Sequence, residues 1–209
     1  MSPTRRPFAV AAFVIVLAWQ GSAQAAGVEV VVQQGSLGAT ASFVSTDATG
    51  CISTAVFVVA NDDTERVLPA PGTRGAQVAV VISQFDLCRV APILTGNGVS
   101  DDAMIVVSPN LREATVNAVV PVLNGANGQL VDVFVDLTFV GTSIMVADNG
   151  VELNPNIPGY FINTTFNQTF RNATAFGSVM TIDDNLTPEP SIDAMIQNVR
   201  VGTVVVARP

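Results

Sequence analysis

Apolar and polar residues alternate along most of this chain, in short runs separated by residues that favour turns. Val, Ala, Thr, Ile and Phe dominate the runs, and Gly, Asn, Asp and Pro stand between them. A two-residue period with many β-branched residues is typical of β-strands. Only residues 191–198 show a weak helical period. The pattern predicts about ten strands, at Val28–Gln33, Gly38–Ser45, Ile52–Ala60, Ala76–Phe85, Ala103–Val107, Ala114–Leu123, Gln129–Val140, Tyr160–Phe170, Ala175–Ile182 and Val199–Ala207.

The predicted turns coincide with clusters of small and polar residues. Glycine adopts positive φ without a steric penalty, and Asn and Asp side chains bond to nearby backbone. The clearest clusters are Asp47–Gly50, Pro69–Gly75, Gly96-Asn97-Gly98, Gly125–Gly128 and Asp148-Asn149-Gly150.

The hairpin around residues 125–128 has a register that the pattern itself selects. If Asn124 pairs with Gln129, one face carries only apolar pairs: Val122 with Val131, Val120 with Val133, Ala118 with Val135, Val116 with Leu137 and Ala114 with Phe139. The other face carries Thr115 opposite Thr138, Asn117 opposite Asp136 and Pro121 opposite Asp132. A slip of one residue would set the aspartates against valines. We therefore expect one buried face and one solvated face.

Residues 160–176 show the same alternation with larger side chains. One parity carries Ile162, Phe166, Phe170 and Phe176, and the other carries Asn163, Thr165, Asn167, Thr169 and Arg171. Because successive side chains of a strand point to opposite faces, this pattern predicts that the phenylalanines lie in the core and the Asn/Thr row is exposed.

This succession of short strands indicates an all-β protein, an antiparallel β-sandwich of the Ig-like or jelly-roll-like kind. We expect a single domain over residues 26–209, because no linker interrupts the pattern; a division into two halves near Pro109 is the alternative. Cys51 and Cys88 are the two cysteines. In an exported chain such a pair predicts one disulfide, which the chain-entropy model values at about 4 kcal/mol.

Residues 1–25 have the features of a secretory signal peptide. Arg5 and Arg6 precede an apolar run from Phe8 to Trp19, and Ala23-Gln24-Ala25 fits a cleavage site. The segment Thr4-Arg5-Arg6-Pro7-Phe8 also fits a twin-arginine signal, although the strongly apolar run favours the general secretory route. We expect the mature protein to be secreted, in an extracellular or periplasmic location, without a membrane span.

Composition excludes several classes of chemistry. The chain contains no histidine and no lysine, so Ser–His–Asp or Cys–His nucleophiles, Schiff-base lysines and phosphate-loop lysines are excluded. Loss of Arg5 and Arg6 leaves seven arginines against seventeen acids, a net charge of −10. The arginines are scattered singly along the sequence, whereas nucleic-acid binding needs clustered cations. We therefore expect neither a nucleic-acid nor an anionic-membrane partner.

Three pairs of aspartates fall in predicted loops: Asp62-Asp63, Asp101-Asp102 and Asp183-Asp184. Calcium binds six to eight oxygen ligands, so these pairs are the metal-site candidates, with Ca²⁺ as the one cofactor that the sequence suggests. The competing interpretation is that aspartate simply favours turns. No calcium-binding motif of known spacing accompanies them.

These observations lead to three hypotheses about function. The first is an exported, non-catalytic β-sandwich protein with a structural, surface or extracellular interaction role, whose partner is a second copy, another protein or a glycan. The second is a Ca²⁺- or glycan-binding module that uses the Asp-rich loops. The third is a hydrolase with two carboxylates, although Asp132 and Asp136 would stand about 13 Å apart along one strand, too far for a glycosidase pair.

Overall fold

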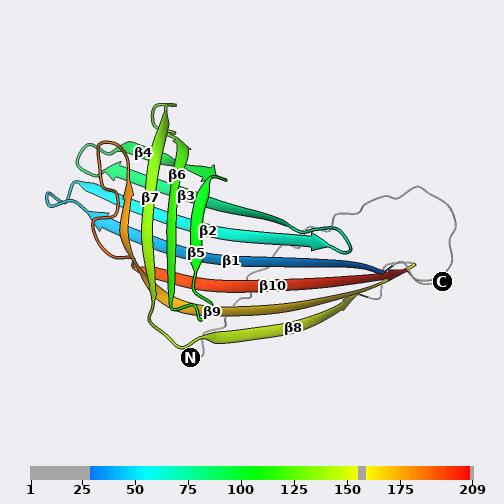
Figure 1. Cartoon of the computed structure of the whole chain (residues 1–209). Coiled ribbons are helices and arrows are strands. Elements are labelled where there is room, and N and C mark those ends of the chain that lie inside the picture. The colour runs from blue at the N-terminus through cyan, green and yellow to red at the C-terminus, as the bar shows by residue number, and fades with distance from the viewer. Residues whose placement is uncertain (1–28, 155–158, 208–209) are drawn as a thin grey trace, which may run out of the picture.

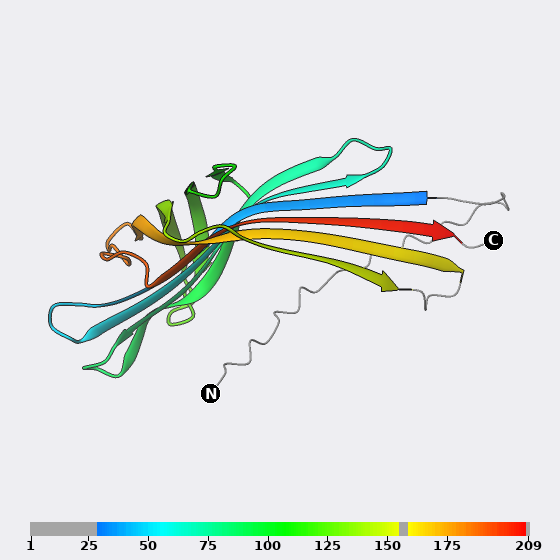
Figure 2. The same ribbon diagram turned by 90° about the horizontal axis from the view of Figure 1, so that it is seen from below.

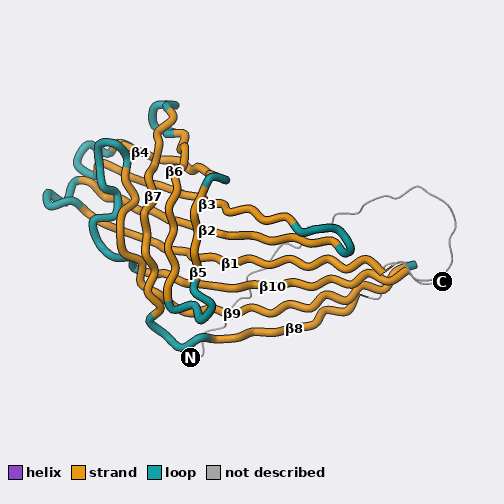
Figure 3. Tube along the Cα trace, in the orientation of Figure 1, coloured by secondary structure: helices purple, strands orange, loops and turns teal. Residues whose placement is uncertain are grey.

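The computed structural model describes residues 29–154 and 159–207, in which every regular element is a β-strand (Figures 1 and 3). The predicted signal peptide lies outside these residues. The all-β prediction is confirmed. The strands are β1 (Glu29–Thr46), β2 (Ile52–Val67), β3 (Thr73–Asp86), β4 (Ala91–Ser100), β5 (Ala103–Val107), β6 (Glu113–Leu123), β7 (Leu130–Gly141), β8 (Val146–Asn154), β9 (Tyr160–Met180) and β10 (Asp193–Ala207).

All ten strands belong to one antiparallel sheet that folds over on itself. The hydrogen-bonded order is β10-β1-β2-β3-β4-β6-β7-β9-β8, with β5 paired to β6 and a further pairing between β9 and β10. In Figure 1, β5, β6 and β7 cross over one end of the long strands β1, β2, β3 and β10. The layered packing that the sequence predicts thus comes from a single continuous sheet.

The hydrophobic core lies only where the sheet covers itself. Alternate residues of the long strands point into it, such as Ala39, Ala41 and Phe43 of β1. The covering layer contributes the opposite wall, including Val120, Leu137 and Phe139. Strands from both sides of Pro109 contribute to this one cluster of buried residues. Burial of alternate side chains from two facing layers is what drives the sheet to fold over.

The β6–β7 hairpin has the predicted register. Val122 pairs with Val131 and Ala114 with Phe139, and each intervening pair also matches the sequence prediction. Alternate residues of both strands are buried, whereas Asp132 and Asp136 are exposed. The prediction succeeded because one face of this hairpin has no polar residue, so that only one register buries it completely.

The disulfide between Cys51 and Cys88 is also confirmed. Cys51 directly precedes β2, and Cys88 follows the end of β3, where Ile52 pairs with Asp86. The bond therefore joins the open end of the β2–β3 pair. Beside it, the Asp47 carboxylate accepts hydrogen bonds from the backbone amides of Cys51 and Ile52 and from the Thr49 hydroxyl. These bonds lower the pKa of Asp47.

Two predicted turns and one weak helix are wrong, because each segment is a strand. Gly96-Asn97-Gly98 lies inside β4, Asp148-Asn149-Gly150 lies inside β8, and residues 191–198 lead into β10. Glycines in strands often mark places where another backbone approaches closely. Such an approach occurs at Gly98, which pairs with Val122 where β4 meets β6. A β-carbon on Gly98 or Gly96 would collide with a backbone oxygen of β6.

The prediction for the phenylalanines of β9 is also wrong. Phe166 and Phe176 are exposed, and the core residues of this strand are Ala173, Ala175 and Val179, on the opposite parity. The reason is that β9 has two different environments along its length. Residues 173–180 pair with β7 within the covered part, whereas residues 162–170 lie between β8 and β10 and extend beyond it. Close packing in the core beside β7 favours the small side chains of Ala173 and Ala175. The larger side chains at the alternate positions therefore do not determine which face of β9 is buried.

We expect the Gly98→Ala variant to lower the free energy of unfolding by about 1–3 kcal/mol, because its methyl group has no room against the β6 backbone. Gly75→Ala is the matched control, since no atom lies within 4 Å of the position its methyl group would take. Urea denaturation of both variants measures the difference. Equal stability of the two variants would contradict the close approach.

Candidate functional site

Beyond the core, the long strands continue as a single layer, which we call the ribbon. It consists of residues 146–154 of β8, 160–170 of β9, 198–207 of β10, 29–37 of β1, 61–67 of β2 and 73–75 of β3. Figure 2 shows these strands extending away from the folded-over part, with no other described strand lying against either face. Among ribbon residues whose side chains are described, none contributes an apolar side chain to the buried core. Both faces of the ribbon are therefore available for contacts.

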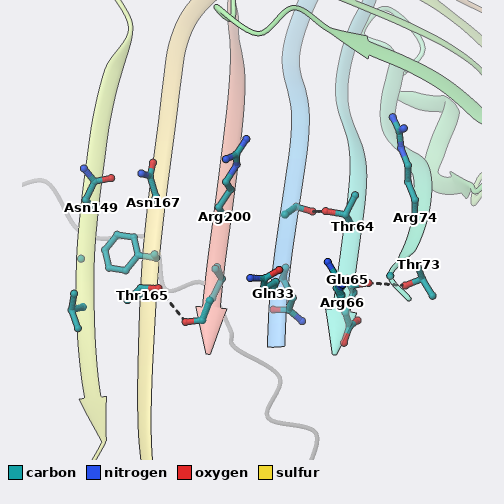
Figure 4. Close-up of a pocket in the computed structure, with 18 residues that line it drawn as sticks. Gln33, Thr64, Glu65, Arg66, Thr73, Arg74, Asn149, Thr165, Asn167 and Arg200 are labelled. Atoms are coloured by element: carbon teal, nitrogen blue, oxygen red, sulfur yellow. Dashed lines mark hydrogen bonds between the residues drawn. The ribbon is translucent and has the colours of Figure 1, made fainter. Parts of the chain in front are cut away.

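The strand register places polar residues from six strands in transverse rows. Residues that pair directly across antiparallel strands project to the same face of a sheet. One row runs through Asn149, Asn167, Arg200, Gly35, Thr64 and Arg74. Figure 4 shows the labelled members of this row at one level of the ribbon. The next row on the same face contains Val151, Thr165, Gly202, Gln33 and Arg66.

These rows continue the face that forms the core elsewhere. Along β1, Gly35 and Gln33 have the parity of buried Ala39, and along β2, Thr64 and Arg66 have the parity of buried Ala60. We call this the inner face of the ribbon. The same side of the sheet is thus apolar where β5–β7 cover it and polar where they do not. The uncovered part of this face contacts water or a polar ligand, and polar side chains can form hydrogen bonds to either.

Both rows line a broad open groove. Its volume is about 1170 Å³, and its lining comes from β8, β9, β10, β1, β2 and β3. The polar groups on the inner face are the amides of Asn149, Asn167 and Gln33, the hydroxyls of Thr64 and Thr165, and three guanidinium groups. Gln34, Thr73 and Glu65, the one acid among the described lining residues, belong to the opposite parity of their strands. The groove therefore offers mainly hydrogen-bond donors and positive charge.

The three arginines of the groove are Arg66, Arg74 and Arg200. Arg74 donates a forked pair of hydrogen bonds to Asp62, with Nε 2.8 Å from Oδ1. The bonds and the charge of Asp62 raise the pKa of Arg74. Among the described residues, Arg66 and Arg200 form no ion pair, and both are exposed. Arg200 is more than a hundred residues away from Arg66 and Arg74 in the sequence, so the sequence did not show these cations as one cluster.

The aspartate pairs do not come together. Asp62-Asp63 lies inside strand β2, so the prediction of a loop there is wrong; Asp101-Asp102 lies between β4 and β5, and Asp183-Asp184 follows β9. One member of each pair is hydrogen-bonded to a neighbouring side chain: Asp62 to Arg74, Asp101 to Gln77 and Asp184 to Gln84. Within the described residues, no three acidic, histidine or cysteine side chains are placed to hold a metal ion.

The sequence did not reveal the groove. Its residues come from six strands, and each contributes only two or three of them. A signal was nevertheless present, because polar residues continue the parity of the core residues along β1, β2 and β10. Such a change from apolar to polar on one face indicates where a covering layer ends, but only the register shows which residues then become neighbours.

Comparisons with known proteins add little to this description. No protein-family model matches the chain. No curated protein matches it either. A crystal structure from Nitrosomonas europaea, described as a "putative AttH", aligns with 86% of this chain at 6% sequence identity and a TM-score of 0.28. The chain spans about half (52%) of the length of that structure. Within the residues that the structure describes, no helix is long and apolar enough to cross a membrane.

We expect Arg74→Ala to destabilise the protein more than Arg66→Ala does, because it leaves the carboxylate of Asp62 buried without its partner. Arg66→Ala removes the same charge from an exposed position and serves as the matched control. Thermal and urea unfolding of the two variants measure the difference. If Arg66→Ala proves equally destabilising, the Asp62–Arg74 pair has no special role in stability.

We expect millimolar Ca²⁺ to leave the melting temperature unchanged, because the six candidate aspartates occupy separate places in the fold. A ligand that binds only the native state raises its stability by RT ln(1 + L/Kd), where L is the free ligand concentration. Calorimetry of the metal-free protein, with Mg²⁺ at equal concentration as a control for ionic strength, tests this. A rise specific to Ca²⁺ would restore the calcium-site hypothesis.

Proposed function

We propose that this is an exported, non-catalytic protein with a structural or surface role, which acts by binding a negatively charged partner on the inner face of its ribbon. The observation that supports this most strongly is the convergence of Arg66, Arg74 and Arg200 on one open groove of a chain that is otherwise acidic. Positive charge gathered in a concavity attracts and orients an anionic partner. The Cys51–Cys88 disulfide is consistent with an extracellular or periplasmic location.

The residues of the groove favour binding over catalysis. General acid–base or nucleophilic chemistry needs a group that titrates near the working pH or an activated nucleophile. Histidine and lysine do not occur in this chain. A glycosidase needs two carboxyl groups about 5–9.5 Å apart, whereas the described lining of the groove has only Glu65. Guanidinium, amide and hydroxyl groups instead make hydrogen bonds to anions and to hydroxyl groups.

An acidic glycan is one candidate for this negatively charged partner. Asn149, Asn167 and Thr165 flank Arg200 on the inner face and could bond to sugar hydroxyls, while the arginines bond to carboxylates. This version of the glycan hypothesis places the contacts in the groove and not in the Asp-rich loops. It depends mainly on hydrogen bonds and charge, because Phe166, the one aromatic residue of the described lining, has the opposite parity to the two inner rows.

We expect the protein to bind a polyanion such as polygalacturonate more tightly than a neutral polysaccharide such as dextran, and to lose at least about tenfold in affinity in the double variant Arg66→Gln/Arg200→Gln, a change of about 1.4 kcal/mol. The matched control is Arg89→Gln/Arg112→Gln, which removes two exposed arginines outside the groove. Titration calorimetry at low and high salt measures the affinities.

Two outcomes would contradict the proposal. Equal affinities for the two double variants would show that the polyanion responds to overall charge and not to the groove. Turnover of a polysaccharide or ester by the purified protein would contradict the non-catalytic role.

A further inference from the structure

The two faces of the ribbon carry opposite charges. On the inner face, the charged residues described are Arg66, Arg74 and Arg200, with Asp62 as the partner of Arg74. On the opposite, outer face, one row runs through Asp148, Gln168, Val199, Ser36, Asp63 and Gly75. The next two outer rows toward the strand ends add Glu65 and then Glu152, and none of these three rows contains an arginine. Among the described residues, the inner face therefore carries two arginines without ion pairs, and the outer face behind it carries four acids.

The far end of the ribbon is apolar on both faces. Val31 and Val204 pair on the inner face, whereas Val30 and Val205 pair on the outer face together with Ile162. All five side chains are only half-buried. Strands with apolar residues on both sides are typical of sheets covered on both sides. An isolated single layer leaves this surface in contact with water, which the hydrophobic effect opposes.

We propose that the ribbon is an interface between copies of this chain, in which the inner face of one copy packs on the outer face of the next. This inference rests on the proposed function and identifies the negatively charged partner as a second copy. Each ribbon then brings Arg66 and Arg200 toward Asp63, Glu65, Asp148 or Glu152 of its neighbour. Its valines are covered on both sides at once.

The size of the ribbon suits such an interface. Six strands about 4.8 Å apart and about eight residues long at 3.4 Å per residue give roughly 800 Å² on each face. Stable protein interfaces bury about 800 Å² on each partner. Because two different surfaces meet, the contact is heterologous and does not close in a pair. Copies can therefore continue to add, which produces an open stack suited to a structural role.

A second copy explains more of the ribbon than the other anionic partners do. A glycan in the groove would cover the inner face only and leave Val30 and Val205 exposed on the outer face. Single-stranded nucleic acid is usually held by aromatic side chains that stack on bases. The two polar inner rows have none, and Phe166, the one aromatic residue of the described groove lining, has the opposite parity. The outer face of a second copy offers both the acids and the apolar residues that complement the inner face.

Sedimentation velocity of the exported protein tests this inference. We expect the mean mass to rise with protein concentration at about 0.01 M salt and to fall when salt reaches about 1 M, because the screening length drops from about 30 Å to 3 Å. A wild-type protein that remains monomeric at low salt and tens of micromolar would overturn the inference.

Charge reversal on each face provides a sharper test. The inner variant is Arg66→Glu/Arg200→Glu, and the outer variant reverses all four outer acids, Asp63→Arg/Glu65→Arg/Asp148→Arg/Glu152→Arg. We expect each to be monomeric alone, because its two faces then carry the same sign, and a one-to-one mixture to associate again, because opposite faces meet between the two variants. The control Arg89→Glu/Arg112→Glu changes charge outside the ribbon and should associate as the wild type does.

The mixture guards against variants that fail to fold, since unfolded chains would not restore each other. Association of either variant alone at the wild-type level, or a mixture that remains monomeric, would overturn the inference. A monomeric wild type that still binds polygalacturonate through Arg66 and Arg200 would overturn the second-copy partner while leaving the proposed function intact. A wild type that neither associates nor binds polyanions would overturn both.

Discussion

The close approach of β4 to β6 is the constraint on which the rest of this fold depends. At Gly98 the backbone of β4 meets that of β6 with no room for a side chain, and Gly96 has the same restriction. This contact lets one continuous sheet turn back over itself, so that β6 and β7 cover the long strands. Without a side chain to hold the two backbones apart, alternate residues of both layers can interdigitate, and the hydrophobic core forms between them.

The same covering layer determines where the core ends. β5–β7 are short, from 5 to 12 residues, whereas β1, β9 and β10 have 18, 21 and 15 residues. The long strands therefore extend beyond the layer that covers them. Inner-face residues change from Ala39 to Gly35 along β1 and from Ala60 to Thr64 along β2 at this boundary. The groove is a consequence of this difference in length.

Charge on the ribbon depends on the period of the strand. Asp63 and Arg66 are close in sequence, yet they project to opposite faces because their positions differ by an odd number. By the same rule, Asp148 projects to the outer face and the next residue, Asn149, projects to the inner face. A modest number of charged residues, arranged by parity, thus gives two surfaces of opposite sign. This arrangement is what makes the ribbon suited to binding and to contact between copies.

The amino-acid sequence by itself determined the local features of this protein. It specified the all-β class, the disulfide and the complete register of the β6–β7 hairpin, because each depends on alternation or on one pair of residues. The same reasoning failed for β9, whose two environments reversed the predicted burial of its phenylalanines, and for β4 and β8, whose glycines were predicted to form turns but lie inside strands. Periodicity shows that two faces differ, but not which one is covered.

Only the tertiary structure decided which face is covered and which distant residues become neighbours. The groove brings together Arg66, Arg74 and Arg200 through hydrogen bonds between strands that are separated by more than a hundred residues. Those pairings result from the sheet folding over as a whole. The physical reason is that side-chain alternation acts over a few residues, whereas the pairing of remote strands follows from the burial of the entire core.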